Sequence, residues 1–196
     1  AFCASAGQRK NGQVVGIDLK RITIGQFHTD EPADSFIHAI FQDTGYKVTY
    51  LTNMEDFLLC HAAYVVPVAF AVYRTDGQLK SLVKDPAYME RVLEAIREGY
   101  RAIEAAGHEI LPPSDRTYDT EAYGRTCLRF LRIMARTKLG GICASDHALN
   151  ATEEMLALAN HLEAFFRVHE APFPVFASLR SETKYYLDRP KFMEQK

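Results

Sequence analysis

The sequence predicts a mainly α-helical protein with a small β segment at its N-terminal end. Residues 1–27 form a strand-rich tract in which short alternating runs are separated by turn residues. From Asn53 onward, apolar residues recur at the spacing of a helix face instead. Glycines and prolines divide this second part into successive helices. We therefore expect a few strands followed by a series of helices.

The N-terminal tract begins with a predicted hairpin. Gln8–Gly12 has the composition of a turn, with Asn11 and Gly12 at its tip, and Asn-Gly supplies the positive φ angles that a tight hairpin needs. Gln13–Ile17 and Arg21–Ile24 are predicted as two strands, the second alternating polar and apolar residues. Tyr46–Leu51, which alternates again and contains β-branched and aromatic residues, is a third predicted strand.

A helix is predicted over Pro32–Gly45, with Gly45 as its C-terminal cap. Its apolar residues fall on one stripe, formed by Phe36, Ile37, Ile40 and Phe41. The segment Phe27–Pro32 is the best candidate for a domain junction, which assigns residues 1–30 to a β-containing domain and residues 31–196 to a helical domain.

Asn53 is predicted to cap the next helix, with Asp56 in its first turn, and Pro67 should kink this helix or break it into two. Pro86–Ala106 has the clearest apolar periodicity, and Gly107 follows its end. Three further helices are predicted over Thr120–Leu139, Ser145–Glu170 and Val175–Leu187.

Composition restricts the class of protein. The chain is 47% hydrophobic and 24% charged with a net charge of -2, which is ordinary for a globular domain and argues against a nucleic-acid-binding surface. The longest apolar run, Ala62–Val72, is about half the length of a membrane span and contains Pro67. The four cysteines and seven histidines show no metal-binding spacing. We expect reduced thiols, no metal and a cytoplasmic location.

The order of these elements resembles the ketopantoate reductase (2-dehydropantoate 2-reductase) family. The segments that carry the resemblance are AGQRKNGQVV at Ala6–Val15, ITIGQ at Ile22–Gln26, EAIREGYRAIEAAGHEILP at Glu94–Pro112, and Asp146–Pro174. Members of that family join an N-terminal Rossmann domain, which binds NADPH, to an all-helical C-terminal domain like that of 6-phosphogluconate dehydrogenase. The resemblance implies that residues 1–30 are the last strands of the Rossmann domain and that the chain begins within a longer protein.

The resemblance also implies an activity and partners. The full protein would be an NADPH-dependent oxidoreductase that reduces a 2-oxoacid-type carbonyl by hydride transfer, and a dimer is expected. NADPH would be bound mainly by a Rossmann half that lies outside this chain, because the chain has no G-x-G-x-x-G motif. This chain alone is expected to be inactive.

The family's catalytic lysine and two substrate-binding asparagines fall on Leu59, Ala63 and Pro67 without a gap. His61, two positions from the missing lysine, is the candidate replacement acid, since imidazole titrates near neutral pH. The alternative is a histidine that only packs and forms hydrogen bonds. Asn53, at the start of the same helix, is a candidate substrate-binding residue.

The family's D-x(7)-E pattern places its catalytic glutamate on Glu154, eight residues after Asp146. His147 lies seven residues before Glu154, so the two should share a helix face and His147 could contact the substrate. Ser145 is the candidate for the family's substrate-binding serine, and its alternative role is a helix N-cap. Glu154 could instead be a solvated charge on the polar side of its helix.

Two other functional classes remain open. Loss of the lysine and both asparagines fits a non-catalytic relative that acts as a binding or assembly module. A helical scaffold unrelated to the family is the third possibility. Strand edges left by a missing half would favour self-association, either through those edges or through the long helices.

Overall fold

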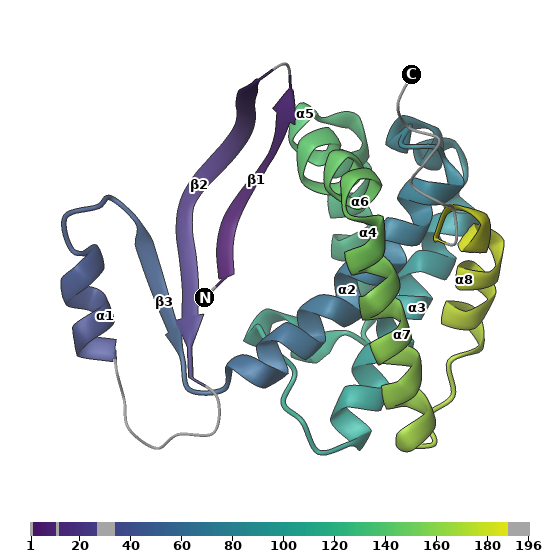
Figure 1. The fold of residues 1–196 in the computed structure, drawn as a ribbon. Helices are drawn as coiled ribbons and strands as arrows, with labels where there is room; N and C mark the ends of the chain where they lie inside the picture. The colour runs from purple at the N-terminus through teal and green to yellow at the C-terminus, as the bar shows by residue number, and fades with distance from the viewer. Residues whose placement is uncertain (1, 11, 27–33, 188–196) are drawn as a thin grey trace.

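Helices make up most of the chain, and a three-stranded sheet stands at one side of them in the computed structural model (Figure 1). The structure describes residues 2–10, 12–26 and 34–187. The predicted junction at Phe27–Pro32 lies outside the described residues. The mainly helical class predicted from the sequence is confirmed.

The sheet has the order β1-β2-β3. β1 (Phe2–Lys10) and β2 (Gln13–Gly25) are antiparallel, and β3 (Lys47–Leu51) pairs in parallel with β2, from Arg21 opposite Lys47 to Gly25 opposite Leu51. The hairpin is joined at Gly12, whose φ of 77° suits the predicted tight turn, whereas Asn11 lies outside the described residues.

The two predicted strands Gln13–Ile17 and Arg21–Ile24 are one continuous strand, so that prediction was wrong. The residues between them are locally irregular instead of forming a turn. Lys20 has a φ of 54°, and its backbone N–H donates to the Asp18 carboxylate at 2.9 Å. This local hydrogen bond stabilises the unusual backbone angle without ending the strand.

α1 (Asp34–Phe41) connects β2 to β3 and is shorter than predicted. The predicted start at Pro32 lies outside the described residues, and the helix ends at Phe41 because a turn intervenes before Gly45, whose φ is 72°. Its apolar stripe is not buried within the chain: Phe36 is 67% exposed and Ile40 is 51% exposed.

α2 (Met54–Arg74) starts directly after β3 and enters the helical part of the molecule (Figure 1). Asn53 caps it as predicted, because its side chain accepts a hydrogen bond of 3.1 Å from the N–H of Asp56. Pro67 was predicted to kink this helix or break it into two, and the break does not occur, because α2 is continuous from Met54 to Arg74. Pro67 is buried, and the packing around it offsets the hydrogen bond that proline cannot donate.

α2 as a whole has the length and apolar composition of a membrane-spanning helix. Its longest apolar run, Ala62–Val72, is by itself too short to span a membrane. Within the structure, 61% of the relevant window is buried. Core helices of soluble proteins have the same properties, so this observation alone assigns no location.

α3 (Pro86–Ala105) packs against α2. Asp85 caps it by accepting a hydrogen bond of 3.0 Å from the N–H of Tyr88. At Gly99 the two helices approach so closely that an added Cβ would lie 2.8 Å from the Cβ of Ala63. Glycine at 99 and alanine at 63 therefore set the distance between these two central helices.

Three short η elements and five other α-helices complete the described part of the fold. They are η1 (Leu79–Lys84), η2 (Pro113–Thr117), α4 (Glu121–Arg136), α5 (Lys138–Gly140), η3 (Gly141–Asp146), α6 (His147–Asn150), α7 (Thr152–Val168) and α8 (Pro174–Leu187).

The predicted helix Thr120–Leu139 ends early, at Arg136, because Thr137 adopts an extended backbone and its side chain accepts a hydrogen bond from the N–H of Gly140. The predicted helix Ser145–Glu170 is also wrong at its start. Ser145 lies inside η3, which is a π-helical turn, and Ala151, with a φ of -118°, separates α6 from α7.

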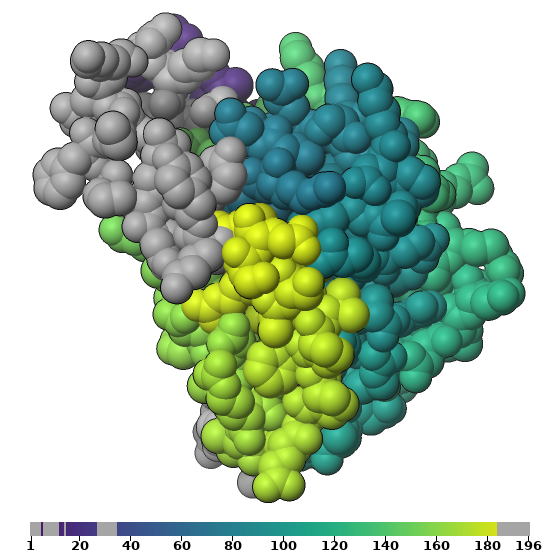
Figure 2. Space-filling model, turned by 90° about the vertical axis from the view of Figure 1, so that its right-hand side faces the viewer, coloured from purple at the N-terminus to yellow at the C-terminus, as the bar shows by residue number. Residues whose placement is uncertain are grey.

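The core lies among α2, α3, α7 and α8, and Figure 2 shows α8 in yellow against its neighbours. Three fully buried rings meet there: Phe176 lies 5.2 Å from Phe70 and 5.3 Å from Phe166 between ring centroids. Each such side chain contributes about 1.5–3 kcal/mol on burial. On the other side of the helices, β1 lies against η3 and α6, which connects the sheet to the helical part.

Candidate functional site

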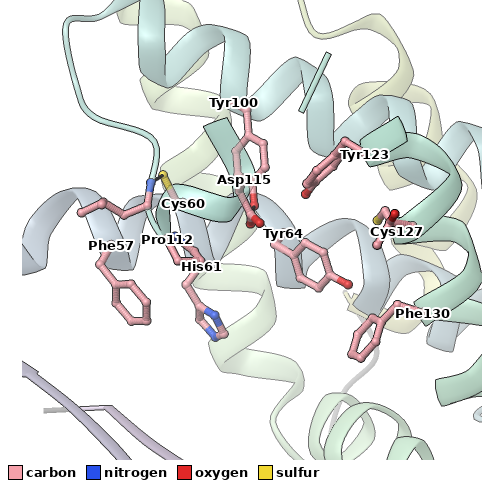
Figure 3. A pocket seen from close by; sticks show the side chains of 12 residues that line it. Phe57, Cys60, His61, Tyr64, Tyr100, Pro112, Asp115, Tyr123, Cys127 and Phe130 are labelled. Atoms are coloured by element: carbon pink, nitrogen blue, oxygen red, sulfur yellow. Dashed lines mark hydrogen bonds between the residues drawn. The ribbon is translucent and has the colours of Figure 1, made fainter. Parts of the chain in front are cut away.

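A cavity of about 350 Å³ opens between α2, α3, η2 and α4 (Figure 3). Its wall is mainly aromatic. Five rings and one imidazole line it: Phe57, His61, Tyr64, Tyr100, Tyr123 and Phe130. The volume is within the range of about 300–1,000 Å³ that is usual for small-molecule sites.

Helical spacing explains how α2 and α4 supply this wall. Phe57, His61 and Tyr64 are four and three residues apart, so they lie on one face of α2. Tyr123 and Phe130, seven residues apart, lie on one face of α4 in the same way. The two faces are turned toward the same space, which places their rings on opposite walls (Figure 3).

Two residues of α2 anchor the segment that leads to the cavity's third wall. The buried Asp56 carboxylate accepts hydrogen bonds of 2.7 Å from the N–H of Glu109 and lies 2.7 Å from Nδ1 of His108. One turn later, Sγ of Cys60 accepts a hydrogen bond of 3.4 Å from the N–H of Leu111. These contacts hold residues 108–111 against α2 and position η2, which carries Asp115.

The hydroxyl group of Tyr100 donates to Oδ2 of Asp115 at 2.9 Å. Tyr123 is close enough to Tyr100, and Cys127 to Tyr64, for the members of each pair to affect one another's pKa. Burial raises the pKa of all three tyrosines above the ordinary value. These hydroxyls therefore keep their protons at neutral pH. The proton of Tyr100 is already donated to Asp115, so this hydroxyl can only accept a hydrogen bond from a ligand.

The two cysteines of the wall are protonated for the same reason. Burial raises the pKa of both the Cys60 and the Cys127 thiol to about 11. Neither is a thiolate nucleophile at neutral pH, because reactivity follows the thiolate form.

His61 is the predicted catalytic residue that lies at this cavity. Burial lowers its pKa, and the charge of His147 lowers it further, so the imidazole is neutral at neutral pH. Its ring is parallel to that of Phe57 within 12°, with 6.3 Å between centroids.

Two of the predicted site residues lie near each other, because Nε2 of His147 is 4.0 Å from Oε2 of Glu154. His147 also contributes to lowering the pKa of His61, which lines the cavity. The prediction that His147 and Glu154 share one helix face was wrong, because they belong to α6 and α7. The bend at Ala151 brings them together instead.

Asn53 and Ser145, the other two predicted substrate-binding residues, make contacts within the chain. Asn53 caps α2, and its Nδ2 donates to the Asp56 carboxylate at 2.6 Å. Ser145 is buried and donates to the backbone carbonyl of Gly77 at 3.0 Å. The alternative role of Ser145 as an N-cap is also wrong, because it lies within a π-helical turn.

The positions that correspond to the family's lysine and asparagines do not line the cavity. Ala63 and Pro67 are buried and Leu59 packs against the hydrophobic core, whereas Phe57, His61 and the other cavity residues occupy a different face of α2. An asparagine at 63 would meet α3 at Gly99, where the helices are in close contact.

Sequence reasoning missed most of the cavity. The available signal was the spacing of Phe57, His61 and Tyr64 on α2 and of Tyr123 and Phe130 on α4. The contribution of Asp115 depends on tertiary contacts and has no such signal. Among the described residues, no group of three or more His, Cys, Asp or Glu side chains could hold a metal ion.

Comparison of the chain with known protein families, with curated proteins and with solved structures finds no match.

Proposed function

We propose that this chain is the substrate-binding part of an NADPH-dependent oxidoreductase that resembles ketopantoate reductase and reduces a 2-oxoacid-type carbonyl. The observation that supports the proposal is the position of His61 at the cavity, together with the His147 and Glu154 pair, whose histidine affects the pKa of His61. These residues come from α2, α6 and α7. The same region adjoins β1, which lies against η3 and α6 on the side of the sheet.

The proposed reaction needs two things from this chain. NADPH would supply a hydride to the carbonyl carbon, and the carbonyl oxygen must then gain a proton. A neutral His61 can donate a hydrogen bond to that oxygen as its negative charge develops. The His147 and Glu154 pair, which is open to solvent, can pass a proton toward it.

Oxidation of NADPH by the full-length gene product, followed with a panel of 2-oxoacids, tests the proposal. We expect turnover of at least one 2-oxoacid, and we expect His61→Gln and Glu154→Gln to lower kcat by about 10²–10⁴ while NADPH binding is unchanged. Glu153→Gln is the matched control, since it removes a neighbouring exposed carboxylate in the same helical turn. Failure of NADPH to bind the full-length product would contradict the proposal.

The second candidate is a non-catalytic relative that keeps the fold as a binding module. It is favoured by the positions of Leu59, Ala63 and Pro67, which offer no polar group to a substrate. Tight NADPH binding without turnover of any 2-oxoacid would support this candidate over the reductase.

A further inference from the structure

We propose that the cavity between α2, α3 and α4 binds a small organic cation, with an amine or quaternary ammonium group attached to an apolar body. This inference does not rest on the reductase proposal and competes with it for this cavity, because a 2-oxoacid is an anion and the proposed ligand is a cation. It concerns equilibrium binding and requires neither NADPH nor turnover.

The first argument is the chemistry of the wall. Phe57, Tyr64, Tyr100, Tyr123 and Phe130 surround the space with aromatic rings, and the lining is predominantly apolar (Figure 3). Aromatic faces attract cations through the negative potential above the ring. Contact between these rings and the apolar body of the ligand is also favourable, because both surfaces are removed from water. Such a wall accepts an alkylammonium group more readily than a compact, strongly hydrated ion.

The second argument is the balance of formal charge. Asp115 is the only carboxylate that lines the cavity, and none of its described lining residues is a lysine or an arginine. His61 does not offset the charge of Asp115, because burial keeps the imidazole neutral by lowering its pKa. A cation that enters the cavity therefore meets one uncompensated carboxylate.

The negative charge of Asp115 acts on the whole wall. It contributes to raising the pKa of five surrounding groups, namely Cys60, Tyr64, Tyr100, Tyr123 and Cys127. Each of these groups would become an anion on losing its proton, so a carboxylate ligand in the same space would experience the same repulsion.

Neither of two nearby arginines pairs with this carboxylate. Arg116, the next residue along the chain, pairs with Glu109. Arg97 is outside the lining, and its guanidinium donates to the backbone carbonyls of Tyr118 at 2.9 Å and Thr120 at 3.0 Å, although its charge lowers the pKa of Tyr123 and Cys127. Asp115 itself accepts hydrogen bonds from Tyr100 and from Ser114 at 3.1 Å, which fix its carboxylate in place. A carboxylate has about four lone-pair sites, so two hydrogen bonds leave capacity for an ammonium group.

Calorimetric titration with three ligands of nearly equal size tests the proposal. The probes are 2-phenylethylamine, which is a cation at neutral pH, 2-phenylethanol, which is neutral, and phenylacetate, which is an anion. We expect the amine to bind roughly tenfold more tightly than the alcohol and phenylacetate to bind most weakly. Equal affinity for amine and alcohol, tighter binding of phenylacetate, or no binding of the amine at millimolar concentration would overturn the proposal.

Asp115→Asn separates the effect of charge from that of shape. The amide can still accept a hydrogen bond from Tyr100, so we expect the preference for amine over alcohol to fall to about one- to threefold with the alcohol affinity unchanged. Asp119→Asn is the matched control, because Asp119 pairs with Arg101 and does not line the cavity. An unchanged preference in Asp115→Asn would overturn the proposal, and the comparison of ligands in the unmodified chain decides it if that variant fails to fold.

Discussion

The carboxylate of Glu98, in the middle of α3, accepts a hydrogen bond of 2.8 Å from the backbone N–H of Phe176 in the first turn of α8. Its other oxygen accepts from the N–H of Val175 at 2.9 Å. The first N–H groups of a helix have no partner within the helix, and a negative charge is favourable at this end. A side chain distant in sequence therefore caps α8 and attaches it to the core.

Replacing Glu98 with glutamine should destabilise the chain by about 1–3 kcal/mol, because the amide can accept one of the two hydrogen bonds but presents a donor to the other N–H. Urea denaturation followed by circular dichroism measures this loss. Glu90→Gln, an exposed substitution on the same helix, is the control and should change the free energy of unfolding by less than about 0.5 kcal/mol. A similar loss in both variants would contradict the capping role.

The stability contributed by Glu98 should also depend on pH. Burial raises the pKa of Glu98 above its ordinary value of 4.5, although the two backbone hydrogen bonds act in the opposite direction. The folded chain therefore holds the proton more tightly than the unfolded chain, and stability is lost as pH rises from 4.5 through the folded pKa. We expect the difference in stability between the native chain and Glu98→Gln to decrease from pH ~4 to pH ~7. A difference that grows over this interval would contradict this reasoning.

The link between His61 and His147 can be measured by titration. Burial and the charge of His147 lower the pKa of His61, so its NMR resonances should titrate with a midpoint below the ordinary 6.5. His147→Ala should raise that midpoint only part of the way to 6.5, because burial is the larger cause. His161→Ala, which removes an exposed histidine of α7, should leave it unchanged. A midpoint that does not respond to His147→Ala would show that the two imidazoles are independent.

The lowered pKa of His61 also predicts that the folded chain loses stability in acid. Because the folded chain binds a proton at His61 less tightly than the unfolded chain, stability is complete above pH 6.5 and is lost as pH falls through the lowered folded pKa. His61→Gln does not titrate at this position and should lose less stability over that window in urea denaturation. A variant that remains as acid-sensitive as the native chain would assign the sensitivity to other groups.

Local sequence patterns predicted the elements that depend on local interactions. Asn53 was sufficient to place the start of α2, since an N-cap requires only the next few residues. Pro67 did not break α2, although proline disfavours an isolated helix. Helix propensity does not include the tertiary packing that stabilises a buried helix. The bend at Ala151 was missed because the apolar periodicity continues across it.

The cavity could be predicted only in part for a related reason. Tyr64 and His61 follow from the period of α2, but Asp115 reaches the cavity because Asp56 and Cys60 hold residues 108–111. These partners are about fifty residues apart in the sequence. Periodicity describes one element at a time and contains no information about such contacts.

The close contact between α2 and α3 makes Gly99 sensitive to enlargement. An added Cβ would lie 2.8 Å from the Cβ of Ala63, so Gly99→Ala should force the helices apart and cost about 1–3 kcal/mol. Gly141→Ala is the matched control, because its φ of -56° is helical and nothing lies within 4 Å of the added Cβ. The control should be neutral or slightly stabilising, and a neutral Gly99→Ala would contradict the close packing.

The cysteines should differ in their reactivity toward iodoacetamide. Burial raises the pKa of Cys60 and Cys127 to about 11, so only about one thiol in a thousand is a thiolate at pH ~8. Cys143 is only partly buried. We expect peptide mass spectrometry to find Cys143 alkylated before Cys60 and Cys127, which should be modified only when urea unfolds the chain. Because Cys60 holds Leu111 at the cavity wall, modification of Cys60 as fast as that of Cys143 would mean that this wall opens in solution.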